Sequence, residues 1–304
     1  MSDPSRMPAI ALAAMHGRRR ATLDVARDLE RRGFAGIYCA SFGDGIGLCE
    51  ALALSTERIH FGTAIAIIYT RIVSDYAQTA ALIHELSGGR FHFGIGVSHV
   101  PVHKRLGVHA GKPLADMRAF VEGLRAVPRV GELPPVVLAA LRDPMVKLAG
   151  EIADGLVFAN AARSHMGHSL GVLPQAKLGD PRFFVGNMIP TCISDDVAAA
   201  AAVNRKTLSG YVTLPNYREY WKQAGYVEEM EAIERALERG ERDALPGLMS
   251  DRWLADTTLY GPAAKVREGF EAWLDAGVRT PILVPSSAVG NQMQALAEMT
   301  ACFS

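Results

Sequence analysis

Short apolar segments alternate with longer amphipathic segments along the chain. Eight apolar segments are bounded by glycine, proline or charged residues, as buried strands are. Between them, apolar residues recur every three or four positions, which is the spacing of one helix face. The pattern predicts strands at residues 9–14, 36–39, 59–68, 91–97, 135–140, 155–159, 183–193 and 280–284.

Residues that suit helix ends mark the boundaries of the amphipathic segments. Gly33 follows the segment 20–31 as an expected C-cap. Ser74 marks the start of a later helix, and Ser194 is the expected N-cap of another. The predicted helices are residues 20–31, 47–56, 74–86, 113–127, 144–149, 195–208, 227–242 and 262–276.

Each predicted strand except the last is followed by helical or loop material. Strict alternation points to a parallel sheet, because parallel strands need crossover connections. Eight such units within 304 residues suit a closed (β/α)8 TIM barrel of the α/β class, and the alternative is an open doubly wound sheet. We expect one domain over 1–304, with a helical and loop insertion at 211–260 and a loop over the barrel mouth at 161–182.

Composition limits the classes of partner. The chain is 49% hydrophobic, which is enough for a large core without disulfides or metals. Lys and Arg number 32, as do Asp and Glu, so no net charge favours nucleic acid or a membrane surface. Neither a signal peptide nor a membrane-spanning apolar run is recognisable. The four cysteines form no CxxC pair, and we expect a cytoplasmic protein with reduced thiols.

Common nucleotide and hydrolase motifs are absent from the sequence. Gly94-Ile95-Gly96 begins like a dinucleotide fingerprint, but His99 stands where the third glycine belongs. The pattern therefore argues against a classical Rossmann NAD site, and there is no phosphate-binding P-loop and no GxSxG nucleophile elbow. Gly94 and Gly96 either let a ligand approach the backbone or allow tight packing of a helix on the strand.

Two histidines follow predicted strands and are candidate site residues. His99 lies just past the end of the strand 91–97, and His16 has the same position after the first strand. In a (β/α)8 barrel these positions face the catalytic rim. We expect no metal site, because the chain has no HExxH motif and Pro101 argues against a helix that presents both His99 and His103.

Several short segments match a known family in order and spacing. They are TERI at 56–59, GTAI at 62–65, YTR at 69–71, LSGGR at 86–90 with GIG at 94–96, LAGEIADG at 148–155, GP at 261–262 and DAGV at 275–278. This set resembles the luciferase-like superfamily of flavin-dependent oxidoreductases. It is most similar to the branch that uses the deazaflavin coenzyme F420, such as methylene-tetrahydromethanopterin reductase. The likeness covers about residues 9–160 and returns near 260–285.

The resemblance implies a (β/α)8 barrel with the cofactor ring at its C-terminal mouth. In the F420 branch a non-proline cis peptide often lies against the ring at the end of the third strand, and the matching bond here is Ala64–Ile65. Ser98 and His99 would then border the ring. Ala139 and Ala140, at the end of the fifth strand, would lie beneath it.

Relatives hold the cofactor phosphate with backbone N–H groups after the sixth strand. The matching residues are Asn160, Ala161 and Ala162, and Arg163 would add positive charge. This chain departs from the family in lacking the Gly-Ser or Gly-Thr often found there. It also has Ile67-Ile68 where relatives commonly have Asn and Pro, which makes the pocket above the ring more apolar.

The resemblance implies hydride transfer between coenzyme F420 and a small organic substrate. His99 is the first candidate for a proton donor, because imidazole titrates near neutrality. His16, Asp44 and Tyr69 are weaker candidates.

Two other functions stay open at this point. One is an FMN-dependent monooxygenase, which the same barrel serves. The other is a non-catalytic paralogue that binds a flavin, a deazaflavin or a small apolar ligand. Tyr217, Tyr220 and Trp221 either line a substrate pocket or serve packing. Relatives are frequently dimers, so we expect a homodimer with a small-molecule substrate.

Overall fold

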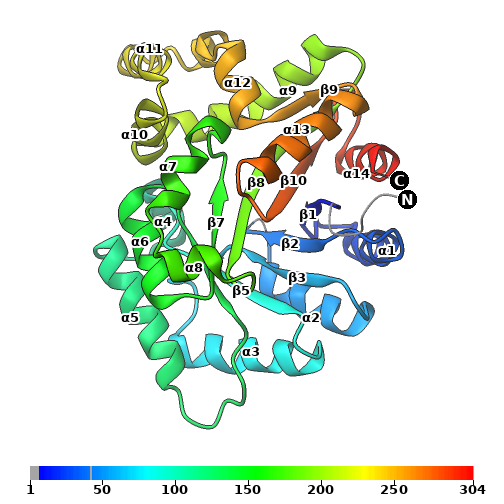
Figure 1. Cartoon of the computed structure of the whole chain (residues 1–304), viewed down its shortest axis with the longest axis vertical. Helices are drawn as coiled ribbons and strands as arrows, with labels where there is room; N and C mark the ends of the chain where they lie inside the picture. The colour runs from blue at the N-terminus through cyan, green and yellow to red at the C-terminus, as the bar shows by residue number, and fades with distance from the viewer. Residues whose placement is uncertain (1–6, 42, 304) are drawn as a thin grey trace. The chain divides into compact units, whose positions relative to one another are not determined.

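The computed structural model describes residues 7–41 and 43–303 (Figure 1). By contacts between Cα atoms the chain divides into two compact units. Unit 1 comprises Met1–Phe158 and Leu170–Gly186, and unit 2 comprises Ala159–Ser169 and Asn187–Ser304. A single domain over the whole chain stays a prediction.

Parallel strands make up the sheet of unit 1. In sheet order they run β1, β2, β3, β5, β6 and β7, and each neighbouring pair is parallel, as the alternation predicts. The short strand β4 extends the pairing with β5. The bounds are β1 (Ala9–Leu12), β2 (Gly36–Ala40), β3 (His60–Ala64), β4 (Ala66–Ile67), β5 (Phe91–Gly96), β6 (Val136–Ala139) and β7 (Gly155–Ala159).

Helices follow these strands, and α1 (Arg19–Arg31) shows how such a helix buries one face. In the first of them, Thr22, Ala26 and Leu29 are the buried residues, and Gly33 follows with φ +79°, a left-handed conformation that suits glycine. The helices of this part of the chain are α1 (Arg19–Arg31), α2 (Gly45–Ser55), α3 (Val73–Leu86), α4 (Val100–Leu106), α5 (Pro113–Ala126), α6 (Asp143–Ile152), α7 (Met166–Gly171) and α8 (Gln175–Gly179).

Unit 2 is mainly helical. Its core includes Trp221, Trp253 and Trp273, each 0% exposed, and the first two rings meet edge to face at 4.8 Å. Strand β9 pairs in parallel with the last residues of β8. The remaining elements are η2 (Arg163–His165), β8 (Phe184–Ile193), α9 (Val197–Ser209), η3 (Tyr211–Thr213), α10 (Pro215–Gln223), α11 (Val227–Glu238), η4 (Arg242–Leu248), α12 (Asp251–Thr257), β9 (Leu259–Gly261), α13 (Ala263–Asp275), β10 (Thr280–Ser286) and α14 (Gln292–Cys302).

Several predicted boundaries differ from the structure. The expected strand 59–68 is interrupted at Ala64–Ile65, where the peptide bond is cis, as the resemblance implied. Ser74 lies inside α3, whose N-cap is Ile72. Asp196 rather than Ser194 caps α9, because its carboxylate accepts the N–H of Ala199 at 2.9 Å.

Two segments expected as loops contain helices. Residues 100–106 form α4, in which Pro101 occupies the first turn. Proline is tolerated there because the first N–H groups of a helix have no intrahelical partner, so the argument against a helix at this position was wrong. The segment 161–182 contains η2, α7 and α8, and Met166, Ser169 and Leu170 are buried at helical spacing.

Arg90, in the LSGGR segment, ties together the N-terminal ends of two neighbouring strands. It is 9% exposed, and its guanidinium lies over the ring of Phe61 at 5.3 Å. It donates to the Thr56 hydroxyl and to four carbonyl oxygens, those of Ala53, Thr56, Ile59 and Ser87. The TERI and LSGGR segments are therefore structural.

Glu30 supports the same edge from α1. Its carboxylate accepts the N–H groups of Glu57, Arg58 and Ile59 at 2.7–2.9 Å. Partial burial works to raise the pKa of Glu30, but these hydrogen bonds outweigh it and hold the pKa below its usual value.

Glu30→Gln is expected to destabilise the protein at neutral pH but much less in acid. The native pKa is lowered, so the ionised carboxylate stabilises the fold above its unfolded-state pKa. That contribution is lost as the pH falls below about 4.3, the ordinary glutamate value. Urea unfolding followed by far-UV circular dichroism between neutral and acidic pH measures this. A wild-type minus variant difference that does not shrink on acidification contradicts the assignment.

Candidate functional site

The C-terminal ends of five adjacent strands in unit 1 carry small residues. Parallel strands end at the same sheet edge, so the ends of β1, β2, β3, β5 and β6 are neighbours. Ala13, Ala40, Ser98 and Ala139 stand at or just past four of these ends, and each is partly exposed. Ala64, which ends β3, is buried. A row of side chains this short lets a flat molecule approach the backbone.

The residues beside the cis bond add apolar surface to this row. Ile65 and Ile67 are partly exposed, whereas Ile68 is 6% exposed. Two alanines are predicted beneath the ring. Ala140 is only 5% exposed, whereas Ala139 is partly exposed and can contact a ligand. We call the set Ala13, Ala40, Ser98 and Ala139 the strand-end row.

Gly94 and Gly96 serve strand packing. A Cβ added to Gly94 would lie 1.8 Å from the carbonyl oxygen of Thr63 on the neighbouring strand. A Cβ added to Gly96 would lie 2.9 Å from Cδ1 of Ile65 and 3.0 Å from Cβ of Ala139. Close packing therefore applies to both glycines, but the neighbours are adjacent strands and Ile65 rather than a helix, as the sequence had suggested.

His99 follows β5 at the N-cap of α4. Ser98, just before it, has φ +59°, a left-handed conformation that turns the chain sharply after the strand. Burial, and then the charge of His103, lower the pKa of His99. The His99 imidazole therefore stays neutral to lower pH than a free histidine. A neutral imidazole carries one N–H donor and one acceptor nitrogen.

The other proton-donor candidates differ in their surroundings. His16 is exposed in the turn after β1. Asp44 caps α2 by accepting the N–H of Gly47 at 2.9 Å. The Tyr69 hydroxyl donates to Asp116 at 2.6 Å, and burial followed by this hydrogen bond raises its pKa. Of the four candidates, His99 alone is an imidazole half-buried at a strand end.

Sequence reasoning missed a hydrogen-bonded group beside His99. His103 contacts the carbonyl oxygen of Val97 through Nε2, and its ring meets the edge of Tyr69 at 5.3 Å. Asp116 accepts from both Tyr69 and the Gly111 N–H. The group braces the segment that follows β5. The only sign of this group in the sequence is the four-residue spacing of His99 and His103, and Pro101 argues against a helix that presents both side chains.

In unit 2, the predicted phosphate segment is a buried turn. Asn160 has φ +55° and is 3% exposed, while Ala161 and Ala162 are 0% exposed. The Asn160 N–H donates to the carbonyl of Met188 at 3.0 Å, and the Ala162 N–H donates to the Tyr220 hydroxyl at 3.2 Å. These N–H groups already have acceptors within the protein.

Aromatic residues pack against this turn. Trp221 donates from Nε1 to the carbonyl of Asn160 at 3.1 Å. Tyr217, Tyr220 and Trp221 are 5%, 1% and 0% exposed. Of the two readings left open for these three residues, packing is therefore the one the structure supports.

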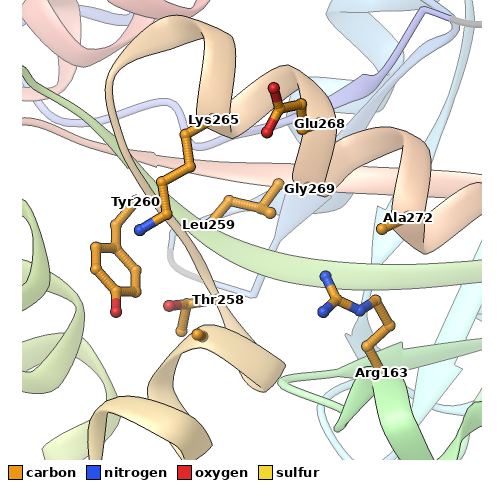
Figure 2. A pocket seen from close by; sticks show the side chains of 9 residues that line it. Arg163, Thr258, Leu259, Tyr260, Lys265, Glu268, Gly269 and Ala272 are labelled. Atoms are coloured by element: carbon orange, nitrogen blue, oxygen red, sulfur yellow. The ribbon is translucent and has the colours of Figure 1, made fainter.

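Arg163 contributes to a cavity of about 270 Å³ in unit 2 (Figure 2). In Figure 2, Arg163 extends from η2, and Lys265 extends from α13 toward the Tyr260 ring, with its Nζ 4.4 Å from the ring centroid. The cavity is lined by Arg163, Ala255, Thr258, Leu259, Tyr260, Lys265, Glu268, Gly269 and Ala272.

Two expected absences have been examined over residues 7–41 and 43–303. In those ranges no three His, Cys, Asp or Glu side chains gather in a way that could hold a metal ion. In the same part of the chain no helix is long and apolar enough to cross a membrane. The homodimer, the small-molecule substrate and the cytoplasmic location stay predictions.

The alternation of strands and helices defines a (β/α)8 barrel, as the sequence predicts. The family model described as luciferase-like monooxygenase matches residues 5–280, and the chain belongs to this family.

Two sequence relatives and one solved structure are similar to this chain. An uncharacterised protein of Mycobacterium tuberculosis is 28% identical over 288 residues, which cover 79% of this chain and 82% of that protein. The 5,10-methylenetetrahydromethanopterin reductase of Methanolobus tindarius is 25% identical over 156 residues, covering 43% and 48% of the two chains. The coenzyme F420-dependent tetrahydromethanopterin reductase of Methanopyrus kandleri has a TM-score of 0.76 at 18% identity, with 97% of each chain covered.

Proposed function

We propose that this protein transfers a hydride between coenzyme F420 and a small organic substrate. The observation that carries the proposal is the strand-end row in unit 1, where small, partly exposed residues end adjacent parallel strands. Such a surface suits one face of a fused-ring heterocycle. A relative from Mycobacterium tuberculosis, 24% identical over 281 residues and named as a putative coenzyme F420-dependent oxidoreductase, supports the choice of the F420 branch.

The residues of the strand-end row fit the ring of such a cofactor. The deazaflavin supplies a ring carbon that accepts or gives up a hydride when it is bound. The short side chains of Ala40, Ser98 and Ala139 would leave room for the ring to stack on the backbone. Ile65 and Ile67 would keep water from one side. His99 would hold or release a proton beside the reacting groups.

Ala139→Trp is expected to abolish cofactor binding, because an indole would fill the place proposed for the ring. Titration of the protein with oxidised F420, followed by cofactor fluorescence, should show a Kd at least about 100-fold weaker than wild type, a loss of about 2.7 kcal/mol. Ala40→Trp, on another strand, tests the same surface independently. Leu82→Trp is the control, because Leu82 is 51% exposed on α3. Unchanged F420 affinity in folded Ala139→Trp and Ala40→Trp contradicts the proposed ring site.

His99→Ala is expected to lower kcat by about 100-fold or more while the Kd for the cofactor changes little, since general acid–base catalysis contributes on this scale. As a proton donor His99 must be protonated, so wild-type kcat should fall as the pH rises through its lowered pKa, which lies below the ordinary histidine value of about 6.5, and the variant should lose this dependence. Steady-state kinetics across pH with F420, compared with direct titration, separates the two effects. An unchanged kcat rules out the role.

The cofactor titration also separates the alternative functions. If FMN binds in place of F420 and the reduced complex consumes oxygen, the protein is a monooxygenase of the luciferase-like type. If neither cofactor binds, it is a non-catalytic paralogue. The proposed hydride transfer predicts that F420 binds and that the reduced complex consumes oxygen only slowly.

A further inference from the structure

The backbone of the turn 160–164 in unit 2 offers few N–H donors to an external anion. Four of its five backbone N–H groups already have acceptors within the protein. Those of Asn160 and Ala162 donate to Met188 and Tyr220, as described above. The N–H of Ala161 lies 3.5 Å from Oδ1 of Asn187. The fourth, that of Ser164, donates to a carboxylate of the chain itself.

That carboxylate belongs to Asp256, on α12. Its Oδ1 accepts the Ser164 N–H at 3.0 Å, and its Oδ2 accepts the Ser164 hydroxyl at 2.6 Å. The Tyr226 hydroxyl donates to the same Oδ2 at 2.8 Å. Asp256 is 8% exposed, so little water competes for these bonds. Burial, and then the hydrogen bond to Asp256, raise the pKa of Tyr226, which stays a donor.

Three donors thus converge on one buried anion. A backbone N–H and two hydroxyls are the groups that commonly hold a phosphate. A phosphate at the same place would have to displace the carboxylate or lie beside it, and two like charges a few ångströms apart in a water-poor site repel strongly. While Asp256 is present, these three donors are therefore not available to a phosphate, and the partly exposed Arg163 side chain remains as the cationic group of the turn.

We propose that Asp256 takes the place of the cofactor phosphate at this turn, so that this protein gains no affinity from the phosphate of a flavin or deazaflavin. The ligand class that follows is a flavin or deazaflavin recognised through its ring and ribityl chain, without its phosphate. The inference rests on the proposed function only in that a flavin-type cofactor is bound.

The test compares riboflavin with FMN, which differ only in the phosphate. Titrations followed by flavin fluorescence give a Kd for each, and the two are expected to agree within about threefold for the wild type. Asp256→Ala frees the donors of Ser164 and Tyr226. The ratio of the riboflavin Kd to the FMN Kd should then rise by about tenfold or more, as expected for charge-assisted hydrogen bonds. Tenfold tighter binding of FMN by the wild type overturns the proposal.

Matched variants keep the result interpretable. Asp251→Ala removes a carboxylate from the same helix, but the Asp251 side chain is 87% exposed, and the variant should leave the Kd ratio unchanged. Asp256→Asn keeps the side-chain volume and removes the charge, and it replaces the alanine variant if that variant does not fold. A ratio equal to the wild-type ratio in a folded Asp256 variant also overturns the proposal.

Inorganic phosphate separates failure of this inference from failure of the proposed function. If the wild type binds no flavin and no F420, the proposed function fails. In that case, and equally if it binds F420 but neither riboflavin nor FMN, thermal unfolding with and without phosphate tests the turn. Phosphate should then raise the Tm of Asp256→Asn more than that of the wild type or Asp251→Ala. Equal shifts in all three proteins overturn the role of Asp256.

Discussion

Gly94→Ala is expected to lower the free energy of unfolding by about 4 kcal/mol or more, among the largest effects a single methyl group can have. Gly94 is buried in β5, and the added Cβ would lie 1.8 Å from the Thr63 carbonyl oxygen and 2.9 Å from its carbonyl carbon. Both are backbone atoms of β3, so no side-chain rotation relieves the overlap. The two strands would have to separate, and their pairing would be lost.

Urea unfolding followed by far-UV circular dichroism measures the effect. Gly123→Ala is the matched control in α5, where the new Cβ would meet only Val73 side-chain atoms, at 3.4 and 3.9 Å. That variant should be neutral or more stable by up to about 1 kcal/mol, because alanine favours helix over glycine. A Gly94→Ala protein that unfolds within about 1 kcal/mol of wild type contradicts the packing role.

Arg90→Ala is expected to cost about 3–5 kcal/mol of stability, the range found when one partner of a buried charged network is removed. The variant deletes every hydrogen bond of the guanidinium and leaves carbonyl groups at the starts of β3 and β5 without their donor. It also removes the cation that lies over Phe61. Leaving a buried carbonyl without a donor lowers stability by more than one typical hydrogen bond adds to it.

Two further variants define this effect. Arg90→Lys keeps the charge but has one ammonium group in place of the planar fork, so it should recover only part of the loss. Arg58→Ala removes an exposed cation from the neighbouring TERI segment and should change stability by no more than about 0.5 kcal/mol. Equal stability of Arg90→Ala and Arg58→Ala would contradict the network described here.

The two edges of the parallel sheet in unit 1 have different roles. Arg90 and Glu30 act at the N-terminal ends of the strands, where they bind backbone groups. The strand-end row lies at the opposite ends. The TERI and LSGGR segments, which helped to identify the family, therefore stabilise the barrel. The proposed chemistry depends on other residues, chiefly Ser98, His99 and Ala139.

Much of the site at the strand ends was predictable from the sequence. The positions of Ser98, His99 and Ala139 follow from where apolar runs stop, and hydrophobic periodicity locates those points well. Helix α4 was not predicted, because proline usually breaks a helix. In α4, however, Pro101 lies in the first turn, where proline is tolerated. The environment of His99, which lowers its pKa, depends on how α4 packs.

The turn 160–164 shows where sequence reasoning ends. The sequence predicts that this turn follows a buried strand. The residues that accept hydrogen bonds from its N–H groups, however, come from distant parts of the chain. Tyr220 lies 58 residues from Ala162, and Asp256 lies 92 residues from Ser164. No local pattern announces such pairs, because spacing along the chain encodes only neighbours on one helix face or one strand.

By itself, the sequence determined the alternation of strands and helices, the (β/α)8 class and the small residues at the strand ends. These features are local, since they depend on periodicity, turn residues and side-chain size. Only the tertiary structure decided that Gly94 and Gly96 serve packing, that Tyr220 and Trp221 seal a turn, and that Asp256 fills its anion position. Each of these outcomes depends on which distant groups meet, and folding alone brings those groups together.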